Sequence, residues 1–373
     1  MTVFDVPLAD LRRRTSIKWT RWEPDVLPMF VAEMDCRMPE PVIERLEQAM
    51  RDGDTGYPEQ PIYQEAYARF AQWRWGWEPD LALTSTAGDV MQAMRYSLER
   101  ATAPGVAVVI NPPIYPPFRH IVTGTGRRIV EVPLVDDRLD LAGLERAFAD
   151  GARAHLLCSP HNPNGTVHTR EELVALAELA KHHDVTLIVD EIHAPLNGAE
   201  FTPFLALPAP GRVLVAASAA KAFNLAGIKA ALLFASPDAE PMLRSLPPYV
   251  GEAMSHFGAL SHATALDASR DFLLELVDEV RANKELFARL VGDKLGLEYR
   301  PSEGTYLAWL DCSFLGLAEP GRFFHEEARV RFNFGGDFAP ETSQFVRVNL
   351  ATSPEVVAEA VDRMARALTR VRS

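Results

Sequence analysis

Chemically useful side chains stand just behind four apolar runs of the sequence. They are Tyr115, Asn162, Asp190 and Lys221. In open α/β sheets, ligands bind beyond the carboxyl ends of the strands, so these positions are the first places to look for a site. A lysine amine forms Schiff bases with carbonyl compounds when it can lose its proton, which burial and a neighbouring cation favour. Lys221 follows a buried-type run on a loop of small residues, and is therefore a candidate to capture a carbonyl group.

Each of these residues also has an ordinary structural explanation. A lone lysine is usually a solvated surface charge, and Asp190 could cap a helix or a turn. The segment Asn162-Pro-Asn-Gly165 has the usual composition of a turn, and Tyr115 could be a core aromatic beside a proline-rich loop. Only the joint order and spacing of these residues favours a site.

The elements that would position these residues are short strands alternating with helices between about residues 80 and 236. The predicted strands are Ala107–Ile110, Ala154–Ser159, Thr186–Asp190, Val213–Ala217 and Ala231–Ala235. They lack polar alternation, as a sheet covered on both faces requires, and the pattern is typical of βαβ units with a mostly parallel sheet. Thr169 and Glu172 form a capping-box pattern, which predicts a helix between the second and third of these strands.

The two ends of the chain carry helical patterns instead. We predict helices over 39–50, over 271–295 and from Pro354 onward. The expected fold is α/β: a large domain with a mostly parallel sheet sandwiched by helices, and a smaller α/β domain built from both termini. The expected divisions are 1–50 and 266–373 for the small domain and 51–265 for the large one.

Composition restricts the classes of function. The 373 residues are 47% hydrophobic, with a net charge of −13 and no basic run, so we expect neither a nucleic-acid partner nor a membrane partner. The start of the chain has no apolar leader pattern, which suggests a cytoplasmic protein. Cys36, Cys158 and Cys312 are too scattered for a disulfide framework or a zinc site, and we expect no metal.

The order Asn162-Pro-x-Gly, then Asp190, then Ser218-x-x-Lys221 resembles the cofactor signature of fold-type I pyridoxal-phosphate enzymes, the aminotransferase class I/II superfamily with the aspartate-aminotransferase fold. Further motifs extend the resemblance over nearly the whole chain and make it similar to the cystathionine β-lyase-like branch, the PatB/MalY-type carbon–sulfur lyases. These motifs are Lys18-Trp19, Phe30 to Asp35, Gly56-Tyr57, Tyr115 to Phe118, Asp190-Glu-Ile-His193, Lys221 to Gly227 and Arg347 to Thr352.

The resemblance implies a role for each residue around the ring of pyridoxal 5'-phosphate. Lys221 would hold the cofactor as a Schiff base and later act as the base at the substrate Cα. Asp190 would stabilise the protonated ring nitrogen, which makes the ring an effective electron sink. Asn162 would donate to the phenolic oxygen with His193 on the same side, and Tyr115 would stack on the ring.

The same resemblance places the phosphate at Gly88, Asp89 and Val90, before a helical run, with Ser218 and Lys229 adding a hydroxyl and a charge. Relatives usually have Gly-Val-Val where this chain has Gly-Asp-Val. An acidic side chain therefore lies near the phosphate position and must point away or bind something.

Two further residues concern the substrate and a second subunit. Arg347 matches the arginine that grips the substrate carboxylate in a bidentate fork, although an ordinary surface or ion-paired arginine is the alternative. Tyr57 matches a tyrosine that reaches the phosphate of the neighbouring subunit, which implies a homodimer with shared active sites.

By resemblance, the reaction is α,β-elimination of a thiol from a thioether amino acid, with pyruvate and ammonia as the other products. The alternative on the same scaffold is an aminotransferase acting on an amino acid and a 2-keto acid, because nearly all these residues serve both reactions. A third reading, a nucleotide-binding module, is disfavoured because the sequence has neither a G-x-G-x-x-G motif after the first strand nor a G-x-x-x-x-G-K-[ST] motif.

Overall fold

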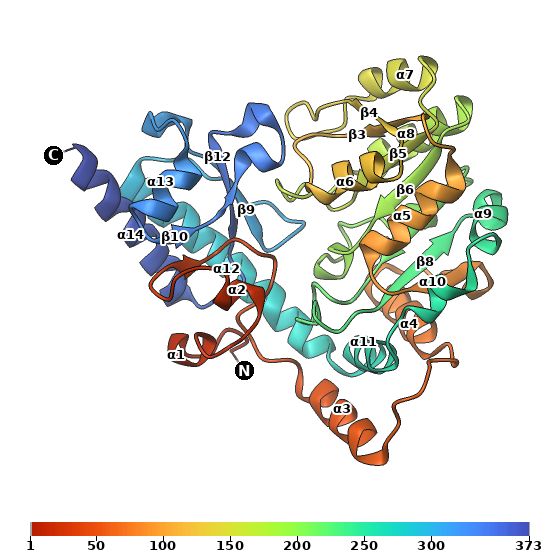
Figure 1. Ribbon diagram of the computed structural model, residues 1–373, viewed down its shortest axis with the longest axis horizontal. Coiled ribbons are helices and arrows are strands. Elements are labelled where there is room, and N and C mark those ends of the chain that lie inside the picture. Colours follow the sequence, from red (N-terminus) through yellow and green to blue (C-terminus); the bar gives the residue numbers. More distant parts are fainter. Residues whose placement is uncertain (1, 373) are drawn as a thin grey trace. The chain divides into compact units, whose positions relative to one another are not determined.

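The computed structural model describes residues 2–372, which fold into two compact units (Figure 1). Unit 1 consists of Met1–Arg37, Asn162–Gly165 and Asp271–Ser373, and unit 2 of Met38–His161 and Thr166–Arg270. These divisions differ from the predicted ones in two respects. Residues 38–50 and 266–270 were predicted in the small domain but lie in unit 2, and Asn162–Gly165 was predicted in the large domain but lies in unit 1. Residues 40–52 form helix α3, which packs against helix α11 of unit 2 through a face containing Val42, Leu46 and Ala49.

Unit 2 is built on a seven-stranded sheet with the order β2-β8-β7-β6-β5-β3-β4. The strands are β2 (Thr84–Ala87), β3 (Ala107–Ile110), β4 (Arg128–Glu131), β5 (Ala154–Cys158), β6 (Thr186–Asp190), β7 (Val213–Ala217) and β8 (Ala231–Ala235). Strands β4, β3, β5, β6 and β7 run parallel, and β8 runs antiparallel to both β7 and β2. The predicted α/β class with a mostly parallel sheet is confirmed.

Helices connect and cover these strands. They are α3 (Glu40–Asp52), α4 (Ile62–Trp75), α5 (Val90–Ala101), α6 (Pro117–Gly124), α7 (Leu141–Ala149), α8 (Arg170–His182), α9 (Glu240–Arg244), α10 (Pro248–Glu252) and α11 (His256–Ala268). The predicted capping box is present at the start of α8, where Thr169 and Glu172 satisfy each other's backbone N–H groups. Helix α5 lies against β6, β7 and β8 (Figure 1), so its N-terminus has a fixed place over the sheet.

Unit 1 contains a three-stranded antiparallel sheet with the order β11-β12-β9 and a parallel pair, β1 and β10. The strands are β1 (Leu27–Pro28), β9 (Leu307–Asp311), β10 (Val330–Arg331), β11 (Asn333–Phe334) and β12 (Phe345–Asn349). The helices are α1 (Leu8–Leu11), α2 (Ile17–Thr20), α12 (Arg270–Leu295), α13 (Pro320–Glu326) and α14 (Pro354–Arg372). An apolar core that includes Phe287, Val348 and Met364 joins α12, α14 and the sheet. Over residues 2–372, no helix combines the length and apolar character needed to cross a membrane.

Candidate active site

Most of the predicted site residues of unit 2 lie along one edge of the large sheet, the edge formed by the carboxyl ends of its parallel strands. Cys158 pairs with Asp190, and Asp190 pairs with Ala216, so the carboxyl ends of β5, β6 and β7 lie side by side. Because β8 is antiparallel to both of its neighbours, its first residues lie beside the ends of β7 and β2. The predicted residues on segments that leave or enter this edge are Gly88, Asp89, Val90, Tyr115, Asp190, His193, Ser218, Lys221 and Lys229.

Asp190 is the last residue of β6 and is buried. Its Oδ1 accepts a hydrogen bond of 2.9 Å from the backbone N–H of Ile192. Burial raises the pKa of the Asp190 carboxyl to about 7, although that hydrogen bond and the positive charge of Lys221 both lower it. A hydrogen-bonded cation, such as a protonated ring nitrogen, would offset the cost of burying the carboxylate.

Lys221 is half-buried on the tight turn that follows β7. The Ser218 hydroxyl donates to the carbonyl oxygen of Ala230 (2.8 Å) and accepts from the N–H of Ala220 (3.2 Å). These bonds tie the turn that carries Lys221, called the lysine loop below, to the start of β8. They also occupy the hydroxyl proton of Ser218, so a phosphate contact by that proton would have to replace the bond to Ala230.

Tyr63 supports the same loop, and no motif in the sequence indicates this role. Its buried hydroxyl accepts from the N–H of Ala219 (3.1 Å) and lies 3.1 Å from Nδ1 of His262. Nε2 of His262 lies 2.9 Å from the carbonyl oxygen of Ile228, and a carbonyl can only accept. Burial lowers the pKa of His262 to about 4, so the ring is neutral, Nε2 carries its proton, and Nδ1 accepts from the Tyr63 hydroxyl. No sequence motif links residues this far apart, because helices α4 and α11 bring them together.

The predicted phosphate segment forms the start of helix α5. Asp89 is the N-cap, and its Oδ1 accepts a hydrogen bond of 2.8 Å from the N–H of Gln92. Its Oδ2 forms an ion pair of 3.0 Å with Nζ of Lys229. The N–H of Gly88 donates to Oε1 of Gln92 at 2.8 Å. The acidic side chain at position 89 is thus engaged both by the helix and by the lysine predicted to contribute charge to the phosphate.

The other predicted residues of unit 2 differ in their exposure. His193 is buried, and its carbonyl oxygen accepts from Nδ2 of Asn197 at 3.0 Å. Tyr115 is partly buried against the core under α5 and α6. Tyr57 is 91% exposed on the segment between α3 and α4.

Unit 1 brings Asn162 and Arg347 into contact. Arg347 lies on β12, is buried, and donates from Nη1 to Oδ1 of Asn162 (2.8 Å). Its Nη2 donates to Oδ1 of Asn333 (2.6 Å) and to the carbonyl oxygen of Phe30 (3.2 Å). Its guanidinium carbon lies 4.9 Å from the centre of the Phe338 ring. The three acceptors named here are neutral amide and carbonyl oxygens, whereas a substrate carboxylate would be a charged acceptor for the same guanidinium.

The segment Phe30–Asp35 is held against β12 by hydrogen bonds from several directions. Asn349 donates to the carbonyl oxygens of Val31 (2.7 Å) and Glu33 (2.6 Å). Lys18 and Asp35 form a fully buried ion pair of 2.8 Å, and Lys18 also donates to the Glu33 carbonyl at 3.1 Å. In the sequence these positions belong to recognisable motifs, but the motifs alone indicate no role for them. The structure shows that they fix the segment whose carbonyl contacts Arg347.

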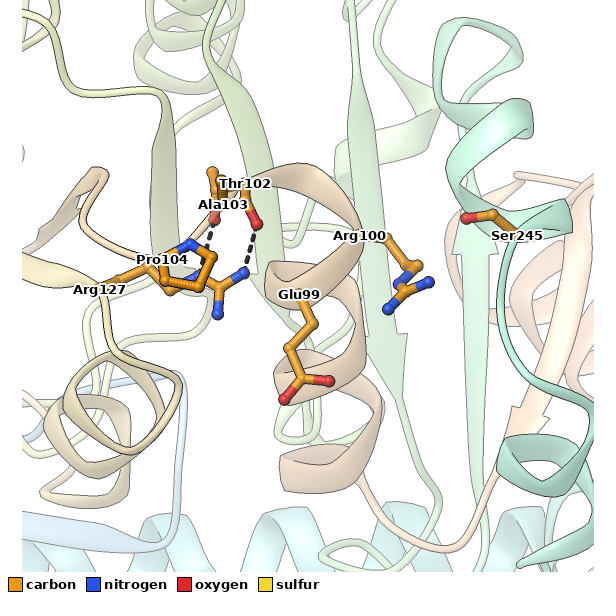
Figure 2. A pocket seen from close by; sticks show the side chains of 7 residues that line it. All are labelled: Glu99, Arg100, Thr102, Ala103, Pro104, Arg127 and Ser245. Carbon is orange, nitrogen blue, oxygen red and sulfur yellow. Dashed lines mark hydrogen bonds between the residues drawn. The ribbon is translucent and has the colours of Figure 1, made fainter.

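The cavity drawn in Figure 2 is a separate feature of unit 2. It has a volume of about 560 Å³ and is lined by Glu99, Arg100, Thr102, Ala103, Pro104, Arg127 and Ser245. It therefore lies at the C-terminal end of α5, the opposite end from Asp89. Arg127 donates to the Thr102 hydroxyl at 3.2 Å and also to carbonyl oxygens of Thr102 and Thr125, which closes a turn. None of the predicted site residues lines this cavity.

Comparison with known proteins covers nearly the whole chain. Residues 25–364 match the family model described as aminotransferase class I and II. A Mycobacterium leprae protein provisionally named cystathionine beta-lyase is 41% identical over 98% of each chain. The cystathionine beta-lyase of Corynebacterium glutamicum is 33% identical over 97% of this chain and 99% of its own. The crystal structure of a Corynebacterium diphtheriae protein, provisionally described as a PLP-dependent beta-cystathionase, gives a TM-score of 0.91 at 31% identity and covers 99% of each chain.

Proposed function

The chain belongs to the aminotransferase class I and II family, and we propose that it is a pyridoxal-phosphate-dependent carbon–sulfur β-lyase. It eliminates a thiol from a thioether amino acid, and hydrolysis of the remaining aminoacrylate by water gives pyruvate and ammonia. The reaction type is supported by full-length relatives named cystathionine beta-lyases. The structural observation that carries the proposal is the buried carboxyl of Asp190 at the edge where three parallel strands end, with Lys221 on the turn that leaves the neighbouring strand β7.

The residues fit the cofactor by their chemistry. When bound, pyridoxal phosphate supplies a carbonyl group for the capture of amines and an electron sink for the charge that develops at Cα. Lys221 would offer the amine, and the carboxylate of Asp190 would stabilise a positive ring nitrogen. Nδ2 of Asn162 and His193 would serve the phenolic oxygen, Tyr115 would cover the ring, and the start of α5 with Ser218 and Lys229 would receive the phosphate.

The chain's own residues then carry out the elimination. Arg347 binds the α-carboxylate of the substrate and orients the bond from Cα to hydrogen. The amine of Lys221 removes that proton as a general base. Asp190 would stay ionised while negative charge develops. The electron pair left at Cα then forms the double bond between Cα and Cβ, and the electron pair of the bond between Cβ and sulfur leaves with the thiolate.

The test separates the lyase from the alternative, an aminotransferase. Purified protein is incubated with cystathionine, and pyruvate and thiol are measured together. Pyruvate formed without any keto-acid acceptor identifies a lyase, whereas dependence on an acceptor identifies a transaminase and contradicts the proposal. Lys221→Ala should abolish both products and the borohydride-sensitive colour of the bound cofactor. The third hypothesis, a nucleotide-binding module, is excluded because the chain belongs to the aminotransferase class I and II family.

We also propose that the enzyme works as a homodimer in the cytoplasm. The high exposure of Tyr57 supports a role in a neighbouring subunit, and three buried cysteines outside any disulfide suit a reducing compartment. Mixing inactive Lys221→Ala protein with Tyr57→Ala protein tests the shared sites. If subunits exchange, hybrid dimers contain one intact site and recover activity, and failure to recover activity after verified exchange contradicts shared sites.

A further inference from the structure

Asp89 gives this chain a feature that the proposed reaction does not require. A carboxylate stands at the N-terminus of α5, where helix dipole and backbone N–H groups favour an anion. It also pairs with Lys229, the cation closest in sequence to the lysine loop. We propose that Asp89 competes with the cofactor phosphate for Lys229 and thereby weakens retention of the cofactor. This inference rests on the proposed function, because it requires that pyridoxal phosphate binds at this edge of the sheet.

The geometry gives the two oxygens of Asp89 separate tasks. Oδ1 caps the helix through the N–H of Gln92 at 2.8 Å. Oδ2 faces Nζ of Lys229 at 3.0 Å. Gly88 immediately follows β2, and Ala87 of that strand pairs with Ala231 of β8, so the ion pair spans the two segments that would flank a phosphate. The capping bond and the ion pair can therefore be separated by substitution.

The ion pair is weak enough to exchange partners. The side chains of Lys229 and Asp89 are 59% and 38% exposed, and water screens such a pair strongly. A phosphate dianion that binds beside them gains from the charge of Lys229 but is repelled by the charge of Asp89. A neutral residue at position 89 would remove the repulsion and release the lysine to the phosphate.

The variant that isolates the charge is Asp89→Asn. Asparagine caps helices about as well as aspartate, so the bond to Gln92 is retained while the negative charge is lost. We expect the Kd for pyridoxal phosphate to fall about tenfold, because the substitution removes one water-screened negative charge that would repel the phosphate. The Kd is measured by quenching of tryptophan fluorescence in the full chain, and cofactor loss from holoenzyme by its absorbance after dialysis.

A matched control lies on the same helix. Glu99→Gln makes the same change in net charge near the far end of α5, where Glu99 pairs with Arg95 at 3.0 Å. We expect this variant to change the Kd less than about twofold, because solvent and salt screen distant charges. Pyridoxal, which lacks the phosphate, should bind equally well to Asp89→Asn and to the wild type.

Lys229→Gln tests the competition itself. If Asp89 occupies the ammonium, this substitution raises the Kd less in the wild type than in the Asp89→Asn background. Asp89→Ser, which also keeps a capping oxygen, replaces Asp89→Asn if the latter does not fold. Equal or weaker binding of pyridoxal phosphate by both neutral variants overturns the inference and leaves the proposed function standing. A wild-type chain that binds no pyridoxal phosphate overturns both.

Discussion

Nη1 of Arg347 donates a hydrogen bond of 2.8 Å to Oδ1 of Asn162. A guanidinium group only donates, so the amide atom that faces it is the oxygen, and Nδ2 is directed away from Arg347. The arginine thereby fixes which atoms of Asn162 can serve a ligand. One hydrogen bond links the residue proposed for the substrate carboxylate to the residue proposed for the phenolic oxygen of the cofactor.

Asn162→Asp should raise the KM for a thioether amino acid more than about tenfold, which corresponds to about 1.4 kcal/mol. A carboxylate in place of the amide oxygen would pair with Arg347 and compete with the substrate carboxylate for the same guanidinium. Steady-state kinetics of pyruvate release measures the change. Asn162→Ala is the matched control, because it removes the acceptor without adding charge. Equal KM values for the two variants would show that competition for Arg347 is not the cause.

In the cofactor-free protein, raising the pH from 5 to 8 should destabilise the wild type relative to the Asp190→Asn variant. Burial raises its folded-state pKa from 3.8 to about 7. Between these values the folded state holds a proton that the unfolded state has released, so increasing pH favours unfolding through this group. The effect is at most about 4 kcal/mol, because one pKa unit corresponds to about 1.4 kcal/mol.

Thermal unfolding of dialysed protein at several pH values measures this effect. The Tm of Asp190→Asn minus that of the wild type should increase between pH 5 and 8, and bound pyridoxal phosphate should stabilise the wild type more than the variant. Glu191→Gln is the control, because burial raises the pKa of Glu191 to about 8 and its carboxylate accepts from the N–H of Phe204. It should show a pH dependence of the same sign but leave the stabilisation by cofactor intact. A flat difference for Asp190→Asn would contradict the raised pKa.

The sequence predicted the interior of the large sheet better than its edges. The five predicted strands coincide with β3, β5, β6, β7 and β8 to within one residue, because strands that are buried on both faces of a sheet are continuous apolar runs. It missed β2, with the sequence Thr-Ser-Thr-Ala, and β4, whose end residues are exposed. Both are edge strands covered on fewer sides, so their composition carries little apolar signal.

The sequence likewise predicted some parts of the site and not others. Residues at the ends of strands were identifiable because topology alone brings such positions to one edge. The residues that support the Lys221 turn could not be identified from the sequence, because Tyr63 and His262 meet only when α4 packs against α11. Nor could the sequence reveal that the charge of Asp89 is matched by Lys229, because that pair depends on the antiparallel entry of β8 beside β2.

Lys18→Met should destabilise the protein by about 3–5 kcal/mol, because it leaves the buried carboxylate of Asp35 without its cation. It should also raise KM, since the pair fixes the segment that contacts Arg347. Thermal unfolding and steady-state kinetics provide the two readouts. The double variant Lys18→Met/Asp35→Asn should be less destabilised than the single one. Arg51→Met removes an exposed ion pair with Glu47 on α3 and should change stability by less than about 0.5 kcal/mol. A loss for Lys18→Met as small as that control would contradict the argument.

Tyr63→Phe should lower both stability and kcat, whereas Tyr67→Phe on the same helix should not. The Tyr63 hydroxyl accepts from the N–H of Ala219, two residues before Lys221, and donates to His262. Its removal leaves two buried polar groups without this partner, at about 1–3 kcal/mol each, and loosens the turn that presents the lysine amine. The hydroxyl of Tyr67 is buried and, within the described part of the chain, makes no hydrogen bond, so its removal should be neutral or stabilising. Tm and single-turnover rates of pyruvate formation measure the two effects. If both variants lose kcat equally, the cause is ring packing on α4 and not the hydrogen bonds that hold the Lys221 loop.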